Sequence, residues 1–158
     1  MSALTAKPLT QAAFAPFGQV LSASGDAPER VAYAGQVENT RPNAIANLTF
    51  IRAAPKSPII RVLERHPFSN QFFIPMKDAL YLVAVCPPLS DGAPDIERLV
   101  TFIAKSGQAV NYNLGVWHAP LCALEQPVDF VMQRWDDGGP EDTVAISLET
   151  PIAVTYTP

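Results

Sequence analysis

The sequence predicts a mainly β, single-domain barrel that spans residues 1–158, and three observations support this fold class. Sixteen prolines recur through most of the chain, and a helix interior tolerates almost none of them. Short apolar runs are bounded by turn residues, which is typical of β-strands. Hydrophobic residues make up 48% of the chain and charged residues 16%, so one packed core is expected. At most two or three short helices fit this pattern.

Only two segments suit helices. The first is Thr10–Phe14, with Thr10 as its N-cap, and the second is Pro94–Leu99, with acidic residues in its first turn. Ser24–Asn43 has no clear pattern, and Pro87–Pro94 is expected to be a surface connection. The expected strands are Gln19–Ser22, Ala46–Arg52, Ile59–His66, Gln71–Pro75, Leu80–Cys86, Val100–Ala104, Ala109–Tyr112, Val116–Leu124, Asp129–Trp135 and Val144–Leu148.

Composition argues against several classes of partner. The net charge is −4 and no cluster of Lys and Arg is present, so nucleic-acid binding is not expected. The longest apolar run, Ala79–Cys86, is far shorter than the ~20 residues that span a bilayer. Met1–Pro8 lacks the apolar core of a signal peptide. We therefore expect a cytoplasmic protein without a membrane partner. In that compartment, Cys86 and Cys122 are expected to be reduced residues of the core.

The two histidines of the chain lie in stretches that suit a metal site inside a barrel. Glu64 and His66 are two residues apart on an expected strand, so they project to the same face. Gln71 follows the short turn Phe68–Asn70, and His118 would come from a neighbouring strand. One carboxylate, two imidazoles and an amide oxygen can bind Ni²⁺, Mn²⁺, Fe²⁺ or Zn²⁺. Without a metal, His66, His118 and Glu64 would serve as general bases.

These residues fit the first of the two motifs of the cupins, jelly-roll β-barrels that hold one divalent metal. Glu64 stands at the position of the first ligand histidine, His66 at the second and Gln71 at the ligand glutamate. Pro58 and Asp78 replace the two glycines of this motif.

The second cupin motif fits without gaps. Gly107, Gly115 and His118 match it, while Asn113 and Cys122 replace a proline and an asparagine. We therefore expect a cupin-type jelly-roll β-barrel with two or three short helices.

Simpler interpretations of each residue stay open. His66 precedes Pro67 and could be a turn residue, and His118 could hydrogen-bond a backbone carbonyl. Gln71 alone would more often be a satisfied polar group.

Eight stretches spread over most of the chain match one known family: Phe17–Val20, Phe50–Pro55, Leu63–Pro67, Gln71–Met76, Val110–Tyr112, Val116–His118, Pro120–Leu121 and Asp129–Phe130. On these residues, the chain resembles the ureidoglycolate lyase family of allantoin degradation, formerly labelled ureidoglycolate hydrolases. The resemblance implies a cytoplasmic homodimer that splits (S)-ureidoglycolate into glyoxylate and urea, with Ni²⁺ as the associated metal. Related sequences often have a second histidine where this chain has Ala119, and glycine where it has Asp78.

For such a substrate, Gln71 is also a possible binding residue, and other residues acquire candidate roles. Arg52 or Lys77 could bind the carboxylate, and Asn111 and Tyr112 could hydrogen-bond the ureido group. Arg52 is equally well read as a solvated charge at a strand end, and Tyr112 as an aromatic residue of the barrel wall.

Three alternative functions stay open. The first is an amidohydrolase that releases ammonia from the same substrate, although its binuclear metal site would need more ligands than two histidines supply. The second is a non-catalytic or sugar-modifying cupin that binds a small carboxylic acid. The third is a purely structural β-module, which should lack a polar cluster inside the barrel.

Overall fold

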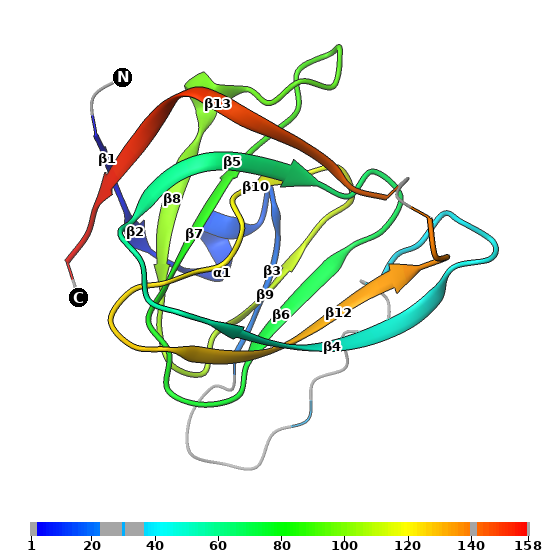
Figure 1. Ribbon diagram of the computed structural model, residues 1–158, viewed down its shortest axis with the longest axis horizontal. Helices are drawn as coiled ribbons and strands as arrows, with labels where there is room; N and C mark the ends of the chain where they lie inside the picture. Colours follow the sequence, from blue (N-terminus) through cyan, green and yellow to red (C-terminus); the bar gives the residue numbers. More distant parts are fainter. Residues whose placement is uncertain (1–2, 23–29, 31–36, 140–141, 158) are drawn as a thin grey trace.

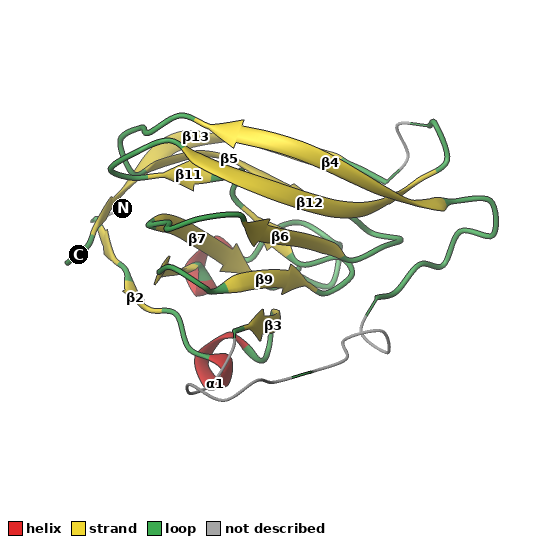
Figure 2. Ribbon diagram, turned by 90° about the horizontal axis from the view of Figure 1, so that it is seen from below, coloured by secondary structure: helices red, strands yellow, loops and turns green. Residues whose placement is uncertain are grey.

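Two β-sheets curve around a shared apolar interior in the computed structural model, which describes residues 3–22, 30, 37–139 and 142–157. The larger sheet has the strand order β1-β13-β5-β10-β7-β8-β2, with β11 paired to β7, and the smaller has the order β3-β9-β6-β12-β4. In Figure 1, β5 and β13 arch over one side of the barrel while β12 and β4 run along the other. Figure 2 shows the same sheets from below. The predicted cupin-type barrel is confirmed.

Helices contribute little to the described part of the chain. They are α1 (Gln11–Phe14) and the short 3₁₀ helix η2 (Ile96–Arg98). Neither is long and apolar enough to cross a membrane. The strands are β1 (Leu4–Thr5), β2 (Lys7–Pro8), β3 (Gly18–Leu21), β4 (Ile45–Ala53), β5 (Ile59–Arg65), β6 (Gln71–Pro75), β7 (Tyr81–Cys86), β8 (Val100–Ala104), β9 (Ala109–Tyr112), β10 (Trp117–His118), β11 (Cys122–Ala123), β12 (Val128–Asp136) and β13 (Val144–Thr155).

Local sequence signals predicted most of these elements. Strands β6, β8 and β9 begin and end where the sequence analysis placed them. The N-cap of α1 is also confirmed, because the Thr10 side chain accepts a hydrogen bond from the backbone N–H of Ala13 at 3.2 Å.

Three expectations were wrong in detail. Val116–Leu124 is not one strand: β10 ends at His118 and β11 begins at Cys122, and Pro120 between them has no N–H for a sheet. Pro94–Leu99 gives only one 3₁₀ turn, and Asp95 forms no side-chain cap. Strand β13 runs seven residues beyond its predicted end. It continues past Pro151 because the proline lies where the register between β13 and β5 shifts, so its missing N–H costs no regular hydrogen bond of the ladder.

The short strands β1 and β2 were missed. Each is two residues long and pairs parallel to a distant partner, β13 or β8, so neither has a local pattern to read. Of Ser24–Asn43, only residues 30 and 37–43 are described, and the remainder lies outside the described residues.

Strand β7 divides the core because both of its faces are buried. Tyr81, Val83 and Val85 pack into the interior between the sheets. Leu82 and Ala84 pack into a second apolar cluster on the other face of the larger sheet. An uninterrupted apolar run such as Ala79–Cys86 is what a strand buried on both faces requires.

The strand pairing aims His118 into the interior. His118 lies opposite Val85 on β7 and opposite Glu64 on β5, and residues directly opposite each other project from the same face of a sheet. Trp117 therefore projects to the other face, where it joins the second apolar cluster. The pair His118–Glu64 is the one registered pair between β10 and β5 in the described chain.

Truncation of the fully buried Leu63, which belongs to the second apolar cluster, should strongly destabilise the fold. We expect Leu63→Ala to lower the free energy of unfolding by about 2–5 kcal/mol, because lost burial and a residual cavity both contribute. The control Leu89→Ala removes a side chain that is 47% exposed, and should change it by about 0.5 kcal/mol or less. Urea denaturation followed by fluorescence measures both. Equal effects would contradict this description of the core.

Candidate active site

Four polar side chains that the sequence analysis singled out meet inside the barrel. Glu64 on β5, His66 just after β5, Gln71 on β6 and His118 on β10 form what we call the polar cluster. His66, Gln71 and His118 are buried, and the Glu64 side chain is 24% exposed. The predicted convergence of these residues is confirmed.

The distances within the polar cluster are short. The rings of His66 and His118 are 5.4 Å apart between centroids. His118 Nε2 lies 3.1 Å from Gln71 Oε1 and 3.5 Å from Glu64 Oε1. Glu64, His66 and His118 each place a potential ligand atom within 4.8 Å of the others.

His66 is oriented by a contact on its far nitrogen. Its Nδ1 lies 2.6 Å from the backbone oxygen of Asp142, and since a carbonyl oxygen only accepts, Nδ1 carries the hydrogen. The lone pair of the neutral ring is then on Nε2, which is buried and has no hydrogen-bond partner in the described structure.

Asp142 also fixes the turn between β5 and β6. Its carboxylate accepts hydrogen bonds from the Phe68 backbone N–H, at 2.9 Å, and from the Ser69 hydroxyl. Arg41 completes this arrangement with an ion pair of 3.0 Å to the same carboxylate. The turn carries His66 at one end and Gln71 at the other, so Asp142 sets their relative position.

His118 is held by its backbone and by an aromatic ring. Its Nδ1 lies 3.1 Å from the Val116 carbonyl oxygen, which again leaves the lone pair of a neutral ring on Nε2. The ring of Tyr112 stacks on the imidazole at 4.2 Å with an interplanar angle of 7°. Burial raises the pKa of Tyr112, so this phenol stays protonated and serves as a neutral wall.

The surroundings perturb the titration of two members of the cluster. Burial raises the pKa of Glu64, but the contact with His118 and the positive charges that both imidazoles carry when protonated lower it by more, so the net direction is downward. Burial and then the nearby His118 lower the pKa of His66. An ionised carboxylate and a neutral imidazole are the forms that bind a metal.

The polar cluster fits a divalent metal ion. Gln71 Nε2 donates to the sulfur of Met132 at 3.2 Å, which turns its Oε1 toward His118. The Nε2 lone pairs of His66 and His118 therefore share a small space with two acceptor oxygens, from Glu64 and Gln71. Such a convergence of acceptors is unfavourable unless a cation or a proton lies among them. Glu64, His66 and His118 form a triad that can hold a divalent metal.

Two glycines of the second cupin motif have a conformational role. Gly107 and Gly115 have φ values of 77° and 72°, which side-chain-bearing residues rarely adopt. The backbone N–H of Gly115 donates to the His66 carbonyl oxygen at 2.9 Å. The glycine thereby ties the loop before His118 to the segment that carries His66.

The structure does not bring Arg52 or Lys77 to the polar cluster. Arg52 lies on the outer face of β4 with its side chain 64% exposed, and its Nε is 2.6 Å from Asp129 on β12. Lys77 lies 3.7 Å from the same carboxylate. Both cations therefore gather around Asp129 on the outside of the smaller sheet.

Asn111 and Tyr112 are adjacent on β9, so they project to opposite faces. Tyr112 faces the interior, where it contacts His118. Asn111 is fully buried on the other face and contacts the side chains of Asn70 and Gln19. Of this predicted pair, only Tyr112 contacts the polar cluster.

Sequence reasoning missed two residues near the polar cluster. Asp142 follows no recognisable motif, and its contacts with His66 and Phe68 span more than 70 residues of sequence. Arg134 was detectable, because it continues the inward alternation of Phe130 and Met132 on β12.

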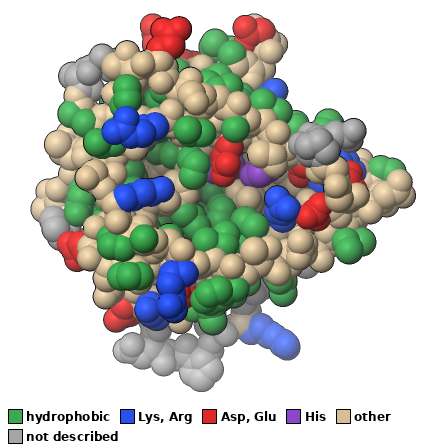
Figure 3. Space-filling view, viewed as in Figure 1, with side chains coloured by type: hydrophobic (Ala, Val, Ile, Leu, Met, Phe, Trp, Pro, Cys, Tyr) green, Lys and Arg blue, Asp and Glu red, His purple; other side chains and the backbone are tan. Residues whose placement is uncertain are grey.

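The mouth of the barrel is hollowed. Figure 3 shows hydrophobic side chains at the bottom of the hollow, and a histidine at its edge with acidic and basic side chains close by. The view looks between β5 on one side and β12 on the other.

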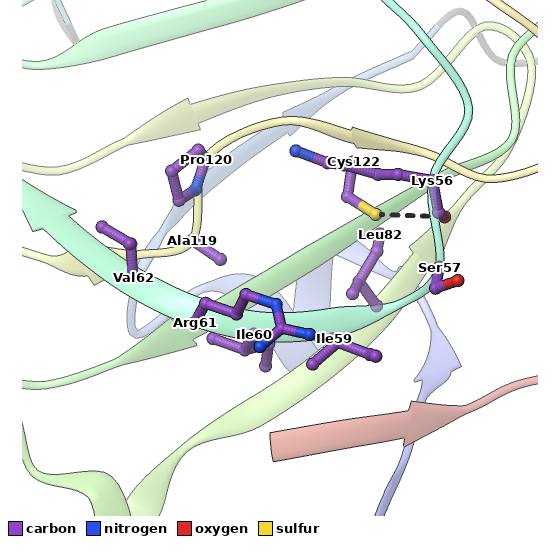
Figure 4. Close-up of a pocket in the computed structure, with 10 residues that line it drawn as sticks. All are labelled: Lys56, Ser57, Ile59, Ile60, Arg61, Val62, Leu82, Ala119, Pro120 and Cys122. Atoms are coloured by element: carbon purple, nitrogen blue, oxygen red, sulfur yellow. Dashed lines mark hydrogen bonds between the residues drawn. The ribbon is translucent and has the colours of Figure 1, made fainter. Parts of the chain in front are cut away.

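Another pocket, of about 350 Å³, lies where the chain turns away from β5 after His118 (Figure 4). Its apolar floor includes Ile60, Leu82 and Cys122, and Lys56 and Arg61 are exposed at its rim. No member of the polar cluster is among its lining residues. The two cysteines of the chain are free and buried, as predicted.

Comparison with known proteins bears on this geometry. The family model described as "Ureidoglycolate lyase" matches residues 1–155. The chain belongs to the ureidoglycolate lyase family. Among its relatives named "Ureidoglycolate lyase", that of Mesorhizobium japonicum is 38% identical over 87% of this chain and 90% of its own length. That of Azotobacter vinelandii is 35% identical over 89% of each chain, and that of Schizosaccharomyces pombe 34% identical over 94% of this chain and 93% of its own.

The metal-free protein should bind one divalent ion at the polar cluster. We expect His66→Ala and His118→Ala each to weaken binding at least ~10-fold, because each removes a ligand lone pair. Isothermal titration with Ni²⁺ or Zn²⁺ measures this without any substrate. Since the pKa of His66 is lowered, binding should persist into acid below the usual imidazole range before protons displace the metal. Equal affinity in both variants and the wild type would rule out this site.

Proposed function

We propose that this protein is a ureidoglycolate lyase, which splits (S)-ureidoglycolate into glyoxylate and urea. The family match over 1–155 and the high coverage of the relatives support this function. The observation that carries it is the polar cluster, where lone pairs of two imidazoles, a carboxylate and an amide converge at the barrel mouth. A purely structural β-module would not need this buried polar cluster. The alternative of a cupin that only binds a small acid is not favoured, because the relatives are named as lyases.

The reaction needs little more than two proton movements. The reacting carbon of ureidoglycolate bears a carboxylate, a hydroxyl group and a ureido nitrogen. The hydroxyl group loses its proton and becomes the carbonyl of glyoxylate, while the carbon–nitrogen bond breaks and the nitrogen takes up a proton to give urea. A site for this reaction must hold the substrate in one orientation and accept the hydroxyl proton.

We propose Ni²⁺ as the metal, with Glu64, His66 and His118 as ligands and the Gln71 oxygen as a weaker fourth. This mixed nitrogen and oxygen donor set is compatible with Ni²⁺. When bound, the ion would acidify the substrate hydroxyl group and orient the substrate.

The side chains would then divide the remaining tasks. Glu64 has the most exposed side chain of the cluster and a pKa below its usual range, so it would be ionised. Its carboxylate oxygen that is not bound to the metal would take up the hydroxyl proton and pass it to the departing ureido nitrogen. Gln71 would contact the bound substrate beside it. Tyr112 keeps the His118 ring fixed by stacking and excludes water from that side.

Product analysis tests the proposed function. With ureidoglycolate, the protein should form glyoxylate and urea in equal amounts, whereas an amidohydrolase would release ammonium. His66→Ala and His118→Ala should each lower turnover by ~10²-fold or more. The control Glu97→Gln changes a residue of η2 and should match the wild type, in contrast to Glu64→Gln. Full activity in a His66→Ala/His118→Ala double variant would refute the site, and ammonium release would refute the reaction.

We further propose that the protein acts as a cytoplasmic homodimer. The exposed side chains of Leu48, Phe50, Ile74 and Met76 form what we call the outer apolar face, on strands β4 and β6 and just beyond β6. Phe50 lies opposite Val131, which lies opposite Ile74, so these side chains form a continuous row across three strands. Contiguous apolar patches of this kind often mark interfaces.

The charges beside this face suit a contact between two copies. Arg52, Lys77 and Asp129 lie at its edge and carry both signs. Because a two-fold interface places the same patch of each copy against the other, mixed charges let cations of one copy meet the carboxylate of the other.

Light scattering after gel filtration tests the homodimer. The wild type should elute as a dimer, and Leu48→Asp/Phe50→Asp should shift it toward a monomer, because charges on the buried face of an interface are strongly unfavourable. Leu89→Asp introduces the same charge at another exposed leucine and should leave the dimer intact. A monomeric wild type, or a double variant that stays dimeric, would contradict the proposal.

A further inference from the structure

Arg134 lies on the inward side of β12. Val128, Phe130 and Met132 belong to the interior core cluster, and alternate residues of a strand share a face. Arg134 is the next residue in that series, and it lies opposite Asn47 on β4. Its side chain is 38% exposed, so an arginine on this inward side can still be reached from solvent.

The position of Arg134 along the barrel brings it near the polar cluster. Gln133 on β12 pairs with Phe72 on β6, so the next residues along the two antiparallel strands are Arg134 and Gln71. Gln71 contacts both Met132, two residues before Arg134, and His118. Figure 3 shows basic and acidic side chains close to the histidine at the edge of the hollow.

The guanidinium group of Arg134 is held in place but not saturated. One terminal nitrogen donates to Asp136 Oδ2 at 2.9 Å, and Asp136 is itself fixed by the backbone N–H of Gly138 at 2.8 Å. The Nε of Arg134 is buried and has no hydrogen-bond partner in the described structure. Arginine has five N–H donors, so this side chain keeps donors for a further acceptor while Asp136 restricts its orientation.

Arg52 offers the opposite situation. Both Nε and a terminal nitrogen of Arg52 donate to Asp129, at 2.6 and 2.9 Å. This bidentate pair occupies the edge of the guanidinium group that would grip a carboxylate. Arg52 is also on the outer face of β4, away from the polar cluster.

We propose that Arg134 binds the carboxylate of the substrate. This inference rests on the proposed function and deepens it, because it assigns the site to small 2-hydroxy or 2-oxo carboxylates. A substrate carboxylate at Arg134 would supply the acceptor that its buried Nε lacks. The adjoining carbon, with its hydroxyl and ureido groups, would then be directed toward Gln71 and the polar cluster. The positive charge also offsets the repulsion between the substrate and the Glu64 carboxylate.

Steady-state kinetics with Arg134→Ala and Arg134→Lys test the proposal. Arg134→Ala should raise KM roughly 10- to 100-fold, since hydrogen bonds to a charged group are lost, and should lower kcat less. Arg134→Lys should recover part of the loss, because it restores the charge without the planar fork. The control Arg98→Ala removes another arginine that is paired to a nearby aspartate, Asp95, and should leave KM unchanged.

A binding measurement separates this inference from the proposed function. Titration with glyoxylate, which retains the carboxylate, should show weaker binding to Arg134→Ala than to the wild type, whether or not turnover occurs. If the wild type splits no ureidoglycolate, the proposed function fails while this titration still decides the role of Arg134. Unchanged KM and glyoxylate affinity in Arg134→Ala would overturn the inference. So would a loss in Arg52→Ala without one in Arg134→Ala. Metal content and melting temperature, measured on each variant, identify a variant that merely fails to fold.

Discussion

The arrangement of the site depends above all on the contacts of Asp142. Its backbone oxygen selects the tautomer of His66, and its carboxylate holds the Phe68 and Ser69 end of the turn between β5 and β6. Removal of these contacts would free the turn that sets the spacing of His66 and Gln71. The cluster therefore depends on a residue that lies more than 70 positions from His66 in the sequence.

The electrostatic character of the site follows from which atoms face one another. In both imidazoles, Nδ1 points away from the cluster and donates a hydrogen bond to a backbone carbonyl oxygen. In the neutral rings, the lone pairs are therefore on the Nε2 atoms that face the cluster. Glu64 and Gln71 add oxygens to the same space. A site built from acceptors attracts positive charge, and it would repel an anionic substrate unless a cation compensates. The metal ion and the inward arginine that we propose would meet these two needs at different places.

The sequence predicted those features that depend on short-range pattern. Alternation and proline spacing identified the barrel, and the cupin spacing identified Glu64, His66, Gln71 and His118. It failed where partners are distant: β1 and β2 pair with strands at the far end of the chain or in its middle. Arg52 was considered for the substrate carboxylate because a sequence shows which residues are charged. It does not show which face of β4 Arg52 lies on, because that depends on the pairing of β4 with β12.

The single registered pair between β5 and β10 has a mechanical consequence. His118 and Glu64 form that pair, so two members of the cluster also join two strands of the larger sheet. The pocket of about 350 Å³ lies beside this pair, where the chain leaves β5 after His118. A ligand that binds both side chains therefore also joins β5 to β10. By linkage, stronger pairing of these two strands would strengthen the binding of that ligand. Because a ligand bound only by the folded state stabilises that state, an ion held by Glu64 and His118 would also stabilise the pairing of β5 with β10.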